Sequence, residues 1–141
     1  MDAVNFFFEG VPCLPIINDD IKRKIHAIVS LENHTILSLN YIFCSDDYLY
    51  TINQQYLNHS YYTDIITFDN SESPLVLSGD IFISMDRVSE NAAIYRVPVP
   101  TELLRIMIHG ILHLVGYDDK LEDLKSLMTQ KEDFYLAKFA F

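Results

Sequence analysis

The segment spanning residues 101–115 constrains the fold most strongly, because it is apolar on nearly every side. Its large apolar side chains are Leu103, Leu104, Ile106, Met107, Ile108, Ile111, Leu112, Leu114 and Val115. A helix that is apolar nearly all round normally lies in the centre of a protein. The segment therefore predicts a central buried helix that begins at Thr101, whose side chain can cap it.

The polar residues of this helix fall on one narrow stripe. They are Glu102, Arg105, His109 and His113. Side chains three and four residues apart lie on the same face of a helix. A buried helix that keeps one polar stripe is expected to face a cleft, so the stripe predicts a functional site.

Hydrophobic periodicity and turn residues predict the remaining elements. We expect strands at residues 5–8, 35–44, 64–68 and 79–84, and further helices at 16–31, 46–57, 86–96 and 121–138, the last of them amphipathic. Strands and helices that alternate only in part predict an α+β or mixed α/β fold with a small mixed sheet. Because no repeat or flexible linker interrupts the 141 residues, we expect a single domain.

Composition limits the classes of partner. Ten basic and twenty acidic residues give a formal charge of −10, which opposes non-specific attraction to nucleic acids and anionic membranes. A polyanionic substrate would need local compensation from a divalent metal, arginines or a partner protein. The N-terminus lacks the basic and long apolar stretches of a signal peptide, so a cytoplasmic location is expected. Cys13 and Cys44 form no C-x-x-C pair and are expected to be small buried residues.

The histidines of the polar stripe have the spacing of metal ligands. His109 and His113 can aim two imidazoles at one point, and Gly116 can end the helix in a left-handed turn that returns Asp119 to them. The pattern H-x-x-x-H-x-x-G-x-x-D matches the metzincin zinc site with aspartate as third ligand. It predicts one zinc ion per chain. Iron is a less favoured metal, and the non-metal alternative is two core histidines beside an ordinary helix end.

Three protein ligands would leave one coordination position open, which is typical of a catalytic zinc. Zinc lowers the pKa of a bound water to about 7 and so creates a nucleophile at neutral pH. Gly110 stands where H-E-x-x-H peptidases carry their glutamate base. The pattern therefore disfavours peptide hydrolysis.

Three motifs resemble those of one known family. The segment HGILHLVGYDD at 109–119 is similar to H-G-x-L-H-L-x-G-Y-D-H, the signature of the YbeY family of bacterial endoribonucleases. The segments TDIITF at 63–68 and GDIFIS at 79–84 resemble the T-D-V-L-S-F and G-D-I-x-I-S segments of that family. The resemblance implies an α+β fold and a zinc-dependent, single-strand-specific endoribonuclease in rRNA maturation and small-subunit quality control. Its partners would be RNA and the small ribosomal subunit or its proteins.

The resemblance implies that His109 and His113 are the first two metal ligands, and Asp119 stands in the place of the family's third histidine. It fails at another position, because the family's RNA-contacting arginine aligns with Leu57. Candidate catalytic substitutes are His59 and Arg105, whose guanidinium can bind phosphate. The alternatives are that His59 is a loop residue and that Arg105 pairs with a glutamate on its own helix.

Four further residues are candidates for ordering the site. Asp64 and Asp80 lie near predicted strand starts. They can either order the metal site by accepting hydrogen bonds from its ligands or act as turn and capping residues. Tyr117 is expected to pack the turn after the histidine helix, and Asp118 to hold it.

Two functional alternatives remain open at the level of sequence. One is a non-catalytic, metal-stabilised ribosome-assembly factor whose acidic surface engages basic ribosomal proteins. The other is a metallohydrolase of another substrate. For a ribonuclease, the residues do not choose between attack by water and attack by the RNA's own 2′-hydroxyl.

Overall fold

The computed structural model describes residues 3–139 and has an α+β fold. Its elements in chain order are β1 (Val4–Glu9), α1 (Asp19–Leu31), β2 (Thr35–Cys44), α2 (Asp46–Leu57), β3 (Ile65–Asp69), β4 (Val76–Ser84), α3 (Met85–Tyr95), α4 (Val99–Leu114) and α5 (Glu122–Lys138). The predicted fold class and the order of elements are confirmed.

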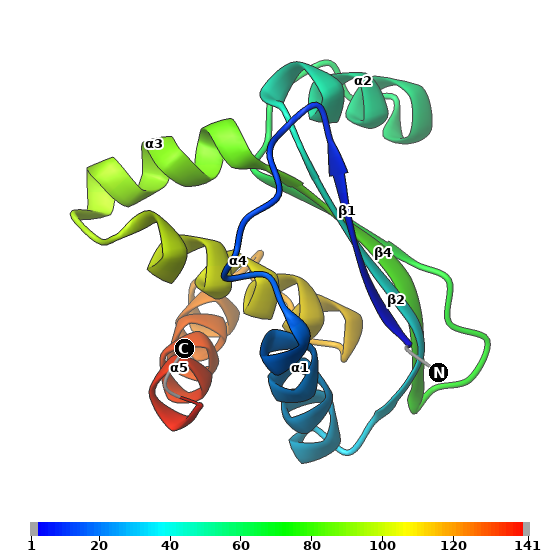
Figure 1. The fold of residues 1–141 in the computed structure, drawn as a ribbon. Coiled ribbons are helices and arrows are strands. Elements are labelled where there is room, and N and C mark those ends of the chain that lie inside the picture. The colour runs from blue at the N-terminus through cyan, green and yellow to red at the C-terminus, as the bar shows by residue number, and fades with distance from the viewer. Residues whose placement is uncertain (1–2, 140–141) are drawn as a thin grey trace.

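The four strands form one mixed sheet in the order β1-β2-β4-β3. β1, β2 and β4 run parallel, and β3 pairs with β4 in the antiparallel direction. Side chains alternate across the sheet, so Ile81 and Ile83 of β4 enter the main core while Phe82 packs on the opposite face. Figure 1 shows α1, α4 and α5 grouped on one side of the sheet and α2 at one end of it.

α4 is the central helix of the main core, as its apolar sequence predicts. Ten of its residues are buried, and eight of these belong to the main core together with side chains from β2, β4 and α1. Gly110 shows how closely α4 approaches the sheet, because a Cβ at this position would lie 2.9 Å from Ile81 Cδ1 and 3.2 Å from Ile65 Cδ1. Position 110 therefore faces the sheet.

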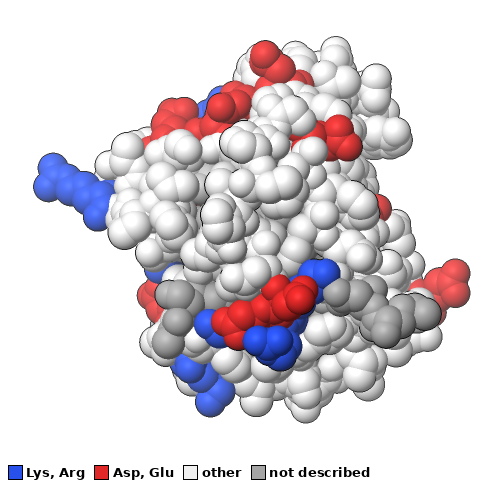
Figure 2. Space-filling model, viewed as in Figure 1, with Lys and Arg blue, Asp and Glu red and all other residues white. Residues whose placement is uncertain are grey.

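A smaller cluster under α2 covers part of the other face of the sheet. It contains Cys44, Leu49, Ile52 and Ile66. α2 begins where the sequence predicts, since the Ser45 side chain accepts a hydrogen bond from the Tyr48 backbone N–H at 3.2 Å. Acidic side chains gather at the α2 end of the molecule in Figure 2.

Two predicted helix starts are wrong by a few residues. α1 begins at Asp19 instead of residue 16, because the Asn18 side chain caps it by accepting from the Ile21 N–H. α4 begins at Val99, so Thr101 lies inside the first turn and does not cap the helix. Prolines at positions 98 and 100 explain this start, since proline suits the first turn, where no intrahelical N–H bond is needed.

Three other expectations need correction. Cys13 is exposed, in the loop before α1, whereas Cys44 is buried as predicted. β4 begins three residues earlier than expected, at Val76. The buried face of α5 is not simply apolar, because Glu132 lies between Met128 and Tyr135 on it. Within the described residues, no helix combines the length and the apolar character needed to cross a membrane.

Candidate metal centre

The histidine helix ends in a glycine turn that sends the chain back across it. Gly116 has a φ of 112°, a left-handed conformation that other residues adopt at a cost. The Tyr117 N–H donates to the Leu112 carbonyl at 2.9 Å, and the Gly116 N–H to the His113 carbonyl at 3.1 Å. These two bonds define a Schellman motif. The turn predicted at Gly116 is therefore present.

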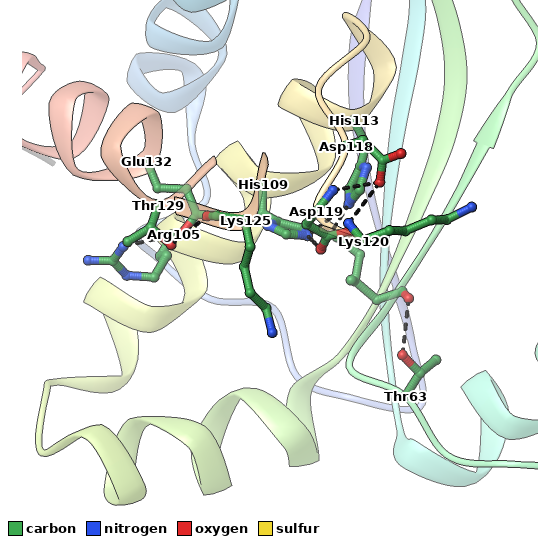
Figure 3. Close-up of polar contacts among 11 residues, drawn as sticks. Thr63, Arg105, His109, His113, Asp118, Asp119, Lys120, Lys125, Thr129 and Glu132 are labelled. Carbon is green, nitrogen blue, oxygen red and sulfur yellow. Dashed lines mark hydrogen bonds and ion pairs between the residues drawn. The ribbon is translucent and has the colours of Figure 1, made fainter. Parts of the chain in front are cut away.

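The residues after this turn are held by side chains on both sides. Asp118 Oδ1 accepts from the Asp119 and Lys120 backbone N–H groups, at 2.6 and 3.0 Å. The Tyr117 hydroxyl donates to Glu32 Oε1 at 2.8 Å and so ties the turn to the end of α1. Tyr117 packs the turn and Asp118 holds it, which leaves the Asp119 carboxylate directed back toward α4 (Figure 3).

Three candidate ligand atoms converge at this point. His109 Nε2 lies 3.0 Å from His113 Nε2 and 3.4 Å from Asp119 Oδ2, and His113 Nε2 lies 3.6 Å from the same oxygen. Ligands on a tetrahedral zinc with bonds of about 2.0–2.1 Å would be separated by about 3.3 Å. The donor types and their spacing therefore fit a zinc ion, and this group could hold a metal.

Glu132 is a site residue that the sequence reasoning missed. Its Oε2 lies 2.6 Å from His109 Nδ1, and its side chain is 9% exposed. An ionised carboxylate can only accept, so Nδ1 carries the proton and the lone pair of a neutral imidazole is on Nε2, at the point where the three candidate ligand atoms converge. The available signal was a glutamate on the buried face of the last helix, where burial requires a partner.

The pKa of His109 reflects this environment. Burial alone lowers the pKa of the imidazole, but the hydrogen bond and charge of Glu132, with the charges of Asp119 and Asp64, raise it above its ordinary value. The carboxylates thus favour a positive charge at this point. A divalent cation would satisfy the same requirement.

Arg105 pairs with carboxylates of another helix. The alternative, that it pairs with Glu102 on its own helix, is not what the structure has. Arg105 Nη1 lies 3.3 Å from Glu132 Oε1 and 2.8 Å from Asp133 Oδ1, both on α5. Both contacts use the same nitrogen, so the guanidinium keeps other N–H groups for an anion. Arg105 is 31% exposed at its side chain and lines the cavity beside the metal group.

The pairing of Arg105 with α5 leaves Glu102 in an unusual state. Glu102 is 5% exposed, and its Oε1 is buried without a hydrogen-bond partner among residues 3–139. Burial raises the pKa of this carboxyl above its ordinary value, and the nearby charge of Arg105 offsets the effect only in part. A buried carboxyl oxygen without a hydrogen bond destabilises the folded state, so its presence calls for an explanation.

The metal group opens into a cavity of about 200 Å³. Its charged side chains are Asp64, Glu102, Asp119, Glu132, Arg105 and Lys125, together with His109. Four carboxylates and two cations give a formal charge of −2, which one divalent cation would neutralise. Lys125 extends from α5 with its ammonium group away from the carboxylates in Figure 3.

The other predicted site residues divide between this cavity and more distant positions. Asp64 lines the cavity. Asp80 lies on the opposite face of the sheet, beside Phe82, and accepts from Asn40 Nδ2 at 3.0 Å. His59 follows α2 and stacks on Tyr61, so it has the contacts of a loop residue. Neither His59 nor Leu57, the last residue of α2, lines the cavity.

Comparisons with known proteins agree with this architecture. The family model described as Endoribonuclease YbeY matches residues 15–140. An endoribonuclease YbeY of Cytophaga hutchinsonii is 51% identical over 136 residues, covering 96% of this chain and 95% of the relative. One from Karelsulcia muelleri is 53% identical over 134 residues, covering 94% and 93%.

A solved structure gives the same answer for the fold. The solution structure of a Thermotoga maritima protein aligns with a TM-score of 0.69 at 30% identity, covering 95% of this chain and 88% of that one. The family match and the curated relatives span nearly the whole chain and include the histidine helix, its turn and the strands beside it. The chain therefore belongs to the YbeY family of endoribonucleases.

Proposed function

We propose that this protein is a zinc-dependent endoribonuclease that cleaves single-stranded regions of ribosomal RNA during maturation and quality control of the small subunit. The observation that carries the proposal is the convergence of His109, His113 and Asp119 at tetrahedral spacing, with His109 and Asp119 lining a cavity. The curated relatives support the endoribonuclease class. The ribosomal target rests on the resemblance of the sequence motifs alone.

His109, His113 and Asp119 would hold the ion. When bound, zinc supplies a Lewis acid that acidifies water and polarises a phosphoryl oxygen. Glu132 keeps the proton of His109 on Nδ1 and fixes the ring by its bond to Oε2. Asp119 adds a negative charge to the site, so this centre is expected to withdraw less charge from its ligands than a site with three neutral histidines.

The phosphate of the substrate is assigned to Arg105 and Lys125. Arg105 lies one turn before His109, about 6 Å along the helix axis, and its guanidinium retains N–H groups beside the cavity. Lys125 lines the same cavity from α5. These two cations take the place of the family arginine, whose position is occupied by Leu57 outside the cavity.

The deciding experiment combines elemental analysis with cleavage of a single-stranded rRNA fragment. We expect about one zinc per chain in the wild type, with cleavage lost on chelation and restored by zinc. The variant His113→Ala should lose stoichiometric zinc while keeping its fold by circular dichroism, since the His113 side chain is 27% exposed and is not part of the main hydrophobic core.

Each negative outcome points to a different error. A variant lacking His113 that retained one tightly bound zinc would contradict the ligand assignment. Bound zinc without cleavage of any rRNA fragment would contradict the enzyme and favour an assembly factor. Cleavage that survives complete chelation would show that the metal group is not the catalytic centre.

A further inference from the structure

A carboxyl group in the cleft has no role in holding the metal. Glu102 is buried, its Oε1 has no hydrogen-bond partner within residues 3–139, and it precedes His109 by seven residues. Seven residues of helix span about 10 Å, too far for Glu102 to act on a metal held by His109. Glu102 therefore belongs to a neighbouring part of the cleft.

That neighbouring part is a second cavity of about 380 Å³, within the size range of small-ligand sites. It shares Tyr95, Glu102, Arg105, Thr129 and Glu132 with the cavity at the metal group, so the two cavities adjoin. Along α4 the cleft therefore presents a metal group, then the cation of Arg105, then the carboxyl of Glu102. This order suits a nucleotide whose phosphate lies at Arg105 and whose base lies at Glu102.

The cleft also supplies an aromatic surface at the same end. Tyr95, in the last turn of α3, is 62% exposed although it lines both cavities. An exposed aromatic ring beside a nucleic-acid groove can stack on a base of any sequence. Asn91 lies one turn earlier on α3 and lines the cavity at the metal group.

We propose that Tyr95 and Glu102 form a nucleobase subsite that prefers guanine in the nucleotide bound next to the metal centre. The inference rests on RNA being the substrate. Guanine presents two adjacent N–H donors on its Watson–Crick edge, and one carboxylate can accept both. Glu102 lines both cavities, so its carboxylate borders the space in which such a base would lie.

The missing hydrogen bond at Glu102 indicates that the bound base carries N–H donors. Arg105, the cation on the same helix, is bound by Glu132 and Asp133. A carboxylate accepts hydrogen bonds and cannot donate them. A ligand with N–H groups can therefore hydrogen-bond the Glu102 carboxylate, whereas a base edge that carries only acceptors cannot. A phosphate at this position would be repelled by the negative charge of the Glu102 carboxylate.

The test is a titration of the zinc-loaded protein with guanosine monophosphate and inosine monophosphate, followed by NMR chemical shifts. Inosine lacks only the exocyclic amino group. We expect wild type to bind the guanosine nucleotide on the order of tenfold more tightly, because a correct two-bond contact to a base edge discriminates by that order. Glu102→Gln should reduce the ratio toward one, since its amide places a donor against a donor.

Stacking is tested separately. Tyr95→Ala should weaken both nucleotides by on the order of tenfold, whereas Tyr95→Phe should retain binding. Tyr61→Ala is the matched control, because Tyr61 is 55% exposed but lines neither cavity. Thermal melting and zinc content of each variant establish that fold and metal site are intact.

The results separate this inference from the proposed function. Equal binding of the two nucleotides by wild type, or discrimination that persists in Glu102→Gln, would overturn the guanine subsite. Zinc-dependent RNA cleavage together with such a result would leave the nuclease in place. Discrimination without any RNA cleavage would instead support the subsite and contradict the nuclease.

Discussion

Replacement of Glu132 by glutamine tests how the metal site is organised. Glu132 accepts from His109 Nδ1 at 2.6 Å and is 9% exposed, so the bond is short, charge-assisted and shielded from water. Hydrogen bonds to charged groups contribute about 1.5–3 kcal/mol. Loss of such a partner behind a metal-binding histidine typically weakens metal affinity by about 10–100-fold. Glutamine keeps an oxygen that can accept from His109 Nδ1–H but removes the negative charge, so we expect Glu132→Gln to weaken zinc binding by about tenfold, the lower end of this range.

The assay is competition for zinc between the protein and a chromophoric chelator at fixed pH. Asp133→Asn provides the matched control, because Asp133 contacts Arg105 at 2.8 Å but is 58% exposed and does not touch His109. Exposed ion pairs contribute about 0–1 kcal/mol, so this variant should bind zinc nearly as tightly as the wild type. Unchanged zinc affinity in Glu132→Gln would refute the role assigned to Glu132.

Two predictions concern stability. Gly110→Ala gains about 1 kcal/mol of helix propensity, but its Cβ would lie 2.9–3.0 Å from two carbons of buried Ile81. Since overpacking costs about 1–3 kcal/mol, we expect a net loss of about 1 kcal/mol in urea denaturation; a more stable variant would contradict the close approach. Burial alone raises the pKa of Glu32, but hydrogen bonds from Tyr135, Tyr117 and Lys131 outweigh it and hold the pKa below its ordinary value. Glu32→Gln should therefore lose about 2 kcal/mol at neutral pH. Because the folded pKa is depressed, this difference should shrink as the pH falls through it, and a constant difference down to acid pH would refute the assignment.

The sequence predicted those features that depend on local chemistry. The apolar character of 103–115 predicted a central helix, and Gly116 predicted the turn that follows it, because both follow from side-chain spacing and backbone sterics. The start of α4 was placed too late, at Thr101, since Pro98 and Pro100 form the entry to the helix.

Contacts between distant segments were harder to anticipate. Glu132 lies 23 residues after His109, and nothing in the spacing of either links them. Arg105 had an acceptor within its own helix, yet α5 supplies two carboxylates at closer range. Asp80 was a candidate for ordering the site because it lies near a predicted strand start, but alternation along β4 directs it to the opposite face.

The acidity of the chain and its RNA substrate class can be reconciled at the cleft. The cavity at the metal group holds four carboxylates against two cations, so its formal charge is −2 without a metal and 0 with one divalent ion. Three of those carboxylates have separate tasks in the arrangement proposed here: Asp119 holds the ion, Glu132 orients His109 and Glu102 reads a base. Metal binding would thus remove the excess negative charge at the place where phosphate must enter, while the rest of the surface stays repulsive to nucleic acid. Such a cleft favours RNA strands that reach the metal and discourages adsorption elsewhere on the molecule.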